Sequence, residues 1–440
     1  MALKVLAVLF LIAITNACTT ASHVKPLSDS PQENDPDQEE TSKLIQLSDD
    51  YHKELKRKGL LYRDEATNQY VNSIGEKLAP NFLQLGEDLN FYIIKDATAN
   101  AAALPNGNVY INIGLLSVAE NEDQLAAILA HELGHVIYRH SLKAMLTRQD
   151  TRRAANIADI FLLGTGLSYI SAQSSLAHYS REQEREADMT SLAYMHQAGY
   201  DVRQIPEIFM IFQTLPESLT VKHSIYSSHP DNKERIDYLQ EKIDEEYSGM
   251  EIKPVKSEAF NNSRSKIVEE NVKIRLNDHQ YELALLTLEQ VEKYYQKAAL
   301  IQYYRGEAYR LKAKNPAKAA KEMEWLSSAY DDEDDREDDV SGQESDTERD
   351  TKVKQDLDYF NNNKAAHYDK ARSFYDEALQ LKPDLARAYK GLGLICYSRK
   401  DYTKAIHHFN TYLDMATAPS DRLYINRLIR NSKQMDEKHD

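Results

Sequence analysis

The stretch HELGH, His131–His135, constrains the fold of this chain more than any other feature. Residues four apart lie one above the other on an α-helix, so the two histidines project from one face and can bind one tetrahedral metal ion together. The surrounding sequence is apolar at 125–130, Val136 and Ile137, which predicts a buried helix. Because burying histidines without partners is costly, this context favours a metal site over two histidines that share a solvated helix face by chance.

Two further residues of this helix support the metal hypothesis. Glu132 projects beside the histidines and can take a proton from a metal-bound water without binding the ion itself. Gly134 costs about 1 kcal/mol relative to alanine inside a helix, and a small residue there suits the close approach of another segment. A catalytic zinc also needs a third protein ligand and leaves a fourth position for water.

A second predicted helix, residues 179–199, is dense in carboxylates and can supply the third ligand. Glu184 and Asp188 are four apart and share a helix face, so Glu184 could complete the metal site while Asp188 orients one histidine through its other ring nitrogen. Glu182 and Glu186 lie on the same segment, which could also be a solvated acidic helix. Spacing alone does not choose among the three glutamates.

The N-terminus, residues 1–18, has the layout of a signal peptide. One lysine precedes an apolar run of ten residues that is too short to span a bilayer, and small and polar residues follow up to Cys18. Residues 19–41 have the composition of a disordered tether, which disfavours a buried N-terminal helix. Cys18 stands where a bacterial lipoprotein signal places its lipidated cysteine, although Thr-Asn-Ala before it also fits an ordinary cleavage site. Either interpretation predicts an exported chain.

Much of the net charge of -16 comes from one acidic segment and not from the whole surface. Residues 331–350 hold 12 of the 70 acidic residues and only 2 basic ones. We expect this tract to be a disordered insertion that spans 331–363, because its composition disfavours a packed core and it has no EF-hand spacing. No basic stripe appears, so the sequence predicts no nucleic-acid partner.

The rest of the N-terminal half predicts an α+β domain over residues 42–250. Residues 67–80 have helical periodicity, residues 89–96 are aromatic and β-branched like a strand, and a turn at Pro-Asn-Gly-Asn leads into a strand at Val109–Ile111. We expect the HELGH helix to run from about Glu122 to Leu146, and the strand at Val109–Ile111 to hold an extended substrate by backbone pairing.

Residues 265–432 have the texture of a helical repeat array. In residues 383–416, Gly393, Ala405 and Phe409 occupy the small and aromatic positions that a tetratricopeptide repeat needs. Three other segments have similar spacing: residues 280–291, 301–314 and 368–384. A generic helical bundle is the alternative. The predicted fold is therefore mainly α, with an α+β domain followed by tetratricopeptide-like repeats that the acidic insertion interrupts.

HELGH followed by SREQEREAD, residues 180–188, resembles the gluzincin peptidases that include the bacterial HtpX heat-shock protease and the eukaryotic CAAX prenyl protease. The order of signal sequence, protease domain and repeats resembles in particular the exported beta-barrel assembly-enhancing branch of that family. Residues 100–116 also resemble that branch's segment before the metal helix. The resemblance implies a zincin-type α+β fold over residues 42–240 and one Zn²⁺ ion per chain.

By the family pattern, His131, His135 and Glu184 bind the zinc ion, and Glu132 activates a zinc-bound water as general base. The resemblance implies that Asp188 lies behind the ligands. It also implies that His229, in the segment SSHPDNKER, is a fourth ligand or gate, and that Arg235 contacts the transition state. On position alone His229 would be a loop histidine, and His140, five residues after His135, is expected to point away from the metal.

The resemblance implies a zinc metalloendopeptidase that acts on misfolded or stalled envelope and outer-membrane proteins. The repeats would bind substrate or the outer-membrane assembly machinery. The expected location is the bacterial periplasm, with a lipid on Cys18 as the one membrane attachment. The alternative is a periplasmic repeat scaffold or chaperone without proteolytic activity, whose zinc site is closed or vestigial.

Overall fold

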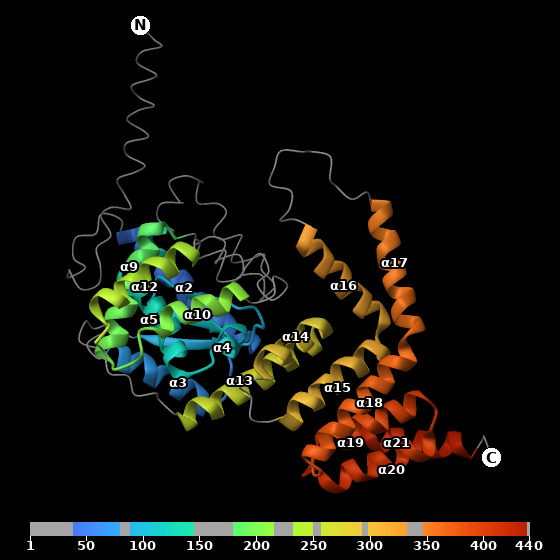
Figure 1. Ribbon diagram of the computed structural model, residues 1–440. Coiled ribbons are helices and arrows are strands. Elements are labelled where there is room, and N and C mark those ends of the chain that lie inside the picture. The colour runs from blue at the N-terminus through green and yellow to red at the C-terminus, as the bar shows by residue number, and fades with distance from the viewer. Residues whose placement is uncertain are drawn as a thin grey trace. The chain divides into compact units, whose positions relative to one another are not determined.

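The computed structural model describes residues 38–79, 89–144, 179–214, 232–249, 257–292, 298–331 and 346–437. The chain forms two compact units, residues 1–270 and 271–440, and the boundary falls within one long helix, α13 (Glu258–Asn277). Figure 1 colours both units along the chain. Within the described ranges, no helix has the length and apolarity needed to cross a membrane. The predicted signal peptide and Cys18 lie outside these ranges.

The N-terminal unit packs helices against one small sheet, as the sequence predicts, and α5 lies at its centre. This helix contacts α3, α9, α10, β2 and β3 (Figure 1). The fold is therefore mainly α with a small sheet, as expected. The remaining elements of the unit are α2 (Gln38–Lys58), α3 (Glu65–Leu78), α4 (Ile113–Val118), α5 (Glu122–Ile137), α9 (Arg181–Gln197), α10 (Gln204–Thr214) and α12 (Asn232–Glu246).

The first helix begins earlier than expected. The four residues Gln38–Thr41, which the sequence placed in the disordered tether, belong to α2. Thr41 and Leu44 are buried, so this turn packs on the unit. Residues 19–37 lie outside the described ranges.

The sheet has three strands in the order β1-β3-β2. β1 (Asn90–Ile94) pairs with β3 (Asn108–Asn112) in parallel, and β2 (Ala101–Ala103) pairs with β3 in antiparallel orientation. β3 is thus the central strand, with both sides occupied. The expectation that Val109–Ile111 pairs with substrate is therefore wrong, because a strand with two neighbours has no backbone groups left for a third.

The sheet has two edges, and they differ. Along β1, residues Leu60 and Tyr62 exchange hydrogen bonds with Lys95 and Ile93, so another segment covers this edge. β2 forms the other edge. Its backbone groups at Ala101 and Ala103 point away from β3, because the hydrogen bonds to β3 come from the alternate positions, Asn100 and Leu104 among them.

Two of the four outward groups of β2 already have partners. The Ala101 N–H donates to the Asn100 side chain, and the Ser141 hydroxyl donates to the Ala103 carbonyl. Within the described part of the chain, no hydrogen bond reaches the Ala101 carbonyl or the Ala103 N–H.

The HELGH helix is shorter than expected. α5 ends at Ile137, nine residues before the predicted end at Leu146, and the chain turns at Tyr138 and Arg139. Arg139 has φ of 52°, a left-handed conformation that stops a helix. A second helical segment starts at His140. No glycine or proline marks this break in the sequence, so the helical periodicity concealed it.

The C-terminal unit is built from helix pairs, as the repeat pattern predicts. Gly393 of α19 faces Phe409 of α20, and a Cβ at Gly393 would lie 2.6 Å from the Phe409 ring. The elements are α14 (Tyr281–Glu292), α15 (Ala298–Lys314), α16 (Pro316–Asp331), α17 (Asp346–Asn362), α18 (Lys364–Leu381), α19 (Ala386–Ser398), α20 (Tyr402–Met415) and α21 (Arg422–Asp436).

The acidic segment is not disordered throughout. The sequence predicted disorder over 331–363, but residues 346–362 form α17. Phe360 near its end is buried and packs against His367 of α18, which anchors the helix. Lys352 and Lys354 each stand four residues before an aspartate, a spacing that supports an exposed helix. Residues 332–345 lie outside the described ranges.

Tyr375 shows how tightly these helices cross. Its ring lies between Gly306 of α15 and Gly391 of α19, where an added Cβ would come within 2.7 Å and 2.4 Å of ring atoms, respectively. The Tyr375 hydroxyl donates to Glu307 of α15. The phenol ring is fully buried, so it cannot move aside without loss of packing.

We expect Gly391→Ala to destabilise the C-terminal unit by about 1–3 kcal/mol, the usual cost of overpacking a filled core. Trp325, the only tryptophan, lies in α16 of this unit, so its fluorescence during urea unfolding reports the effect. Gly249→Ala is the control, because an added Cβ there meets nothing within 4 Å. Equal midpoints for the two variants would contradict this close packing.

Candidate metal centre

The site depends on how closely α5 crosses α9. A Cβ added to Gly134 of α5 would lie only 2.7 Å from the Ala187 Cα of α9. The two helices therefore meet with glycine against backbone, as the small residue inside HELGH suggested. α9 begins at a capping box in which Ser180 and Gln183 satisfy each other's backbone N–H groups. This cap fixes where the helix starts.

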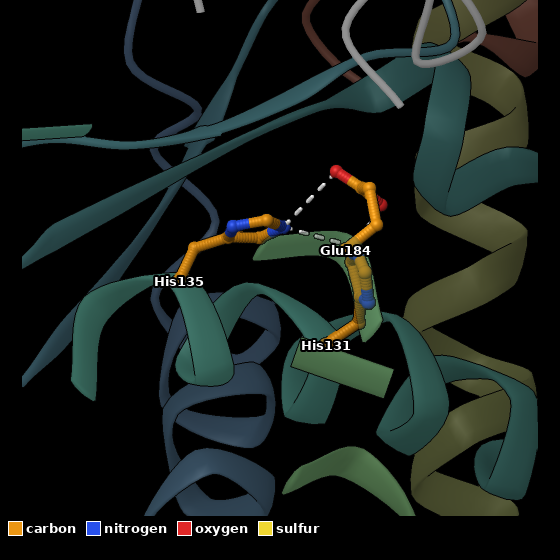
Figure 2. A group of neighbouring side chains, drawn as sticks. All are labelled: His131, His135 and Glu184. Carbon is orange, nitrogen blue, oxygen red and sulfur yellow. Dashed lines mark hydrogen bonds and ion pairs between the residues drawn. The ribbon is translucent and has the colours of Figure 1, made fainter. Parts of the chain in front are cut away.

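Glu184 is the glutamate that faces the two histidines, as Figure 2 shows. The His131 Nε2 and His135 Nε2 atoms are 3.1 Å apart, and Glu184 oxygens lie 3.5 Å from the first and 3.7 Å from the second. A tetrahedral ion with bonds of about 2.0–2.1 Å separates its ligands by roughly 3.3 Å. The three donors thus fit one zinc ion, and among the described residues they form the one such group.

Asp188 lies behind His131. Its Oδ1 is 3.0 Å from His131 Nδ1, so the imidazole donates there and presents Nε2 to the metal position. Tyr238 of α12 also donates to Asp188. Although burial alone would raise the pKa of Asp188, the charge of Arg235 and the hydrogen bond from His131 hold it below its usual range. Asp188 is therefore a carboxylate at neutral pH.

Arg235 lies on α12, and its guanidinium faces the carboxylates of α9. Nε and Nη2 donate to Asp188 at 2.8 Å and 2.7 Å, and Nη1 lies 2.8 Å from a Glu184 oxygen. The other face of the guanidinium stacks on Phe209 of α10, 4.4 Å from the ring centre. Arg235 is 3% exposed, so it holds Asp188 and Glu184 from inside the protein.

Glu132 is fully buried beside the ligands. Burial raises its pKa to about 7, the neighbouring Glu184 carboxylate adds to this shift, and His131 and Arg235 oppose it. A carboxyl with a pKa near neutrality exchanges a proton readily, which suits a general base.

The structure adds residues that the sequence did not single out. His140 is fully buried and is not one of the three donors, but it lies against His135 on the side away from them, with 2.9 Å between the two Nδ1 atoms. Its Nε2 lies 2.9 Å from a Glu186 oxygen. Tyr179 stacks on the His135 ring with 3.9 Å between centroids and hydrogen bonds to Ser141. Burial lowers the pKa of His140 to about 4.

Tyr179 and Ser141 also connect the metal centre to the sheet edge. Ser141 contacts Tyr179 and donates to the Ala103 carbonyl of β2. The edge strand therefore lies two side chains away from His135. Of the predicted site residues, His229 lies outside the described ranges, and the other six belong to this one buried cluster: His131, Glu132, His135, Glu184, Asp188 and Arg235.

Comparison with known proteins places the metal centre within a family domain. Residues 65–243 match Peptidase family M48, and residues 364–421 match a tetratricopeptide repeat. The beta-barrel assembly-enhancing protease of Escherichia coli strain K12 is 29% identical over 201 residues, 42% of this chain and 39% of the relative. The chain therefore aligns with well under half the length of that relative.

Two other relatives are also similar to part of this chain. The metalloprotease YcaL of Escherichia coli is 28% identical over 214 residues, which cover 46% of this chain and 83% of the relative. The mitochondrial metalloendopeptidase OMA1 of Schizosaccharomyces pombe is 33% identical over 162 residues, which cover 35% of this chain and 46% of the relative.

We expect the purified chain to bind one zinc ion at this centre, and binding should stabilise the fold. At a zinc concentration 100 times Kd, the gain is roughly 2.7 kcal/mol, visible as a higher melting temperature that a chelator reverses. His131→Ala and Glu184→Gln should abolish the gain. His196→Ala, an exposed histidine on α9, is the control. Zinc stabilisation that survives both ligand variants would contradict the assignment.

Proposed function

Because residues 65–243 match peptidase family M48 and residues 364–421 match a tetratricopeptide repeat, we propose that this chain is an exported zinc-dependent endopeptidase. The observation that carries the proposal is the spacing of the His131, His135 and Glu184 donors beside the buried Glu132. The substrates would be misfolded or stalled envelope and outer-membrane proteins, an inference supported by the name of the beta-barrel assembly-enhancing relative.

The two histidines and Glu184 would hold the zinc ion. When bound, zinc supplies a Lewis acid that polarises the scissile carbonyl and makes water more acidic. Glu132 then accepts the proton of the attacking water and returns it to the leaving amine nitrogen. Its burial and its raised pKa support this role in both directions of proton transfer.

We assign Arg235 the role of positioning Asp188 and Glu184. The family resemblance implied a transition-state contact, but the guanidinium in this structure directs its nitrogens at Asp188 and Glu184. A planar fork that binds two carboxylates at once fixes their distance from each other and from His131. Asp188 in turn fixes the tautomer of His131. Arg235 therefore acts on the metal through two other residues.

The substrate would add to the sheet at β2. The Ala101 carbonyl and the Ala103 N–H offer one acceptor and one donor, so a peptide could lie antiparallel with one residue opposite Ala102. The connection from Ala103 through Ser141 to Tyr179, which stacks on His135, supports a short path from this edge to the metal.

The roles proposed for His229, the repeats and Cys18 rest on the sequence alone. His229 would gate or cap the metal, the repeats would contact substrate or the outer-membrane assembly machinery, and a lipid on Cys18 would tether the chain in the periplasm. The alternative is a periplasmic scaffold or chaperone with a closed zinc site. The intact donor set together with Glu132 favours the enzyme.

We expect Glu132→Gln to lower cleavage of casein by about 10²–10⁴-fold while zinc content stays at one per chain, because general-base catalysis contributes about that much. Glu182→Gln, an exposed glutamate on α9, is the matched control. His229→Ala is assayed in parallel, since a capping histidine would mask activity in the wild type. Zinc retained without cleavage in both the wild type and His229→Ala would favour the scaffold.

We expect Arg235→Lys to weaken zinc binding by about 10–100-fold, the usual effect of disturbing a residue behind the ligands. A lysine supplies one point charge and cannot bind both carboxylates as a fork does. Excess zinc should then restore much of kcat. Unchanged zinc affinity with a lasting loss of kcat would support a transition-state contact instead. Arg185→Lys, on the exposed side of α9, is the control.

A further inference from the structure

His140 is a buried histidine with no role in the mechanism above. In a continuous helix, a residue five positions after His135 would lie about 140° round the axis and face away from it. The break at Arg139 brings His140 back against His135 instead. A buried polar side chain held in this way by a left-handed backbone residue calls for an explanation.

The contact between the two histidines allows two arrangements of one hydrogen. Their Nδ1 atoms are 2.9 Å apart, a hydrogen-bond distance, so one of the two nitrogens carries a hydrogen and the other accepts it. If His135 donates, its Nε2 has a lone pair for the metal. If His140 donates, a neutral His135 carries its hydrogen on Nε2, which blocks metal binding.

Glu186 selects between these two arrangements. A carboxylate accepts hydrogen bonds and cannot donate them, and it lies 2.9 Å from His140 Nε2. His140 must therefore carry its hydrogen on Nε2, which leaves its Nδ1 as the acceptor for His135. The relay has one direction: His135 Nδ1 donates to His140, and His140 Nε2 donates to Glu186.

We propose that His140 and Glu186 are positioning residues that hold His135 in the tautomer that binds metal through Nε2. They would serve His135 as Asp188 serves His131. Rings on both sides restrict rotation, because Tyr179 stacks on His135 and Tyr138 stacks on His140 with 5.6 Å between centroids. Glu186, whose side chain is 45% exposed, connects this relay to the protein surface.

The inference deepens the proposed zinc site, and it can be tested on the zinc-free chain as well. Histidine-selective ¹⁵N NMR of the zinc-free chain identifies which ring nitrogen carries hydrogen. We expect His135 to be protonated on Nδ1 and His140 on Nε2. In Glu186→Leu, a measurable share of His135 should move to the Nε2–H form. His135 protonated on Nε2 in the wild type would overturn the relay.

Zinc affinity, measured by chelator competition, is the second readout. Glu186→Leu should weaken binding by about 10-fold, within the range for residues behind metal ligands, and His140→Leu by at least as much. Glu186→Gln keeps an acceptor oxygen without the charge and should retain most of the affinity. Glu182→Leu removes the same charge one turn earlier on α9 and serves as the control.

The double variant separates a relay from two independent effects. If Glu186 acts through His140, Glu186→Leu should change zinc affinity little in a His140→Leu background. Additive losses would overturn the relay, and so would an affinity that Glu186→Leu and His140→Leu leave unchanged. A wild-type chain that binds no zinc would refute the proposed enzyme, and the NMR measurement would still decide the relay.

Discussion

The crossing of α5 and α9 at Gly134 is the contact on which the metal centre depends. A side chain at Gly134 would collide with Ala187, so this contact sets the distance between the two helices. His131 and His135 come from one side of this contact and Glu184 from the other. The donor spacing is therefore a property of helix packing.

Behind this crossing, each histidine has its own partner at Nδ1. Asp188 takes this position for His131 and His140 takes it for His135, so both rings turn Nε2 toward Glu184. Arg235 then holds Asp188 and Glu184 together from α12. The centre is thus assembled from four segments of the chain, and only the HELGH turn of α5 is local in sequence.

Because only the HELGH turn is local, the sequence could predict some parts of the site and not others. Helical spacing was enough to pair His131 with His135, but the choice among Glu182, Glu184 and Glu186 depends on which face of α9 meets α5, a tertiary fact. The contact of His140 with His135 was missed because the helix break at Arg139 has no glycine or proline to mark it. The central position of β3 was also hidden, because the short strand β2 is an alanine run without alternation. The repeat helices were predictable, since their packing positions recur at fixed offsets.

The length of the edge strand β2 matters for a chain that would meet unfolded proteins. A long open sheet edge in contact with unfolded, strand-forming proteins invites uncontrolled growth of mixed aggregates. β2 is three residues long, and the Asn100 and Ser141 side chains occupy half of its outward groups. An edge of this length is too short to seed a sheet between molecules.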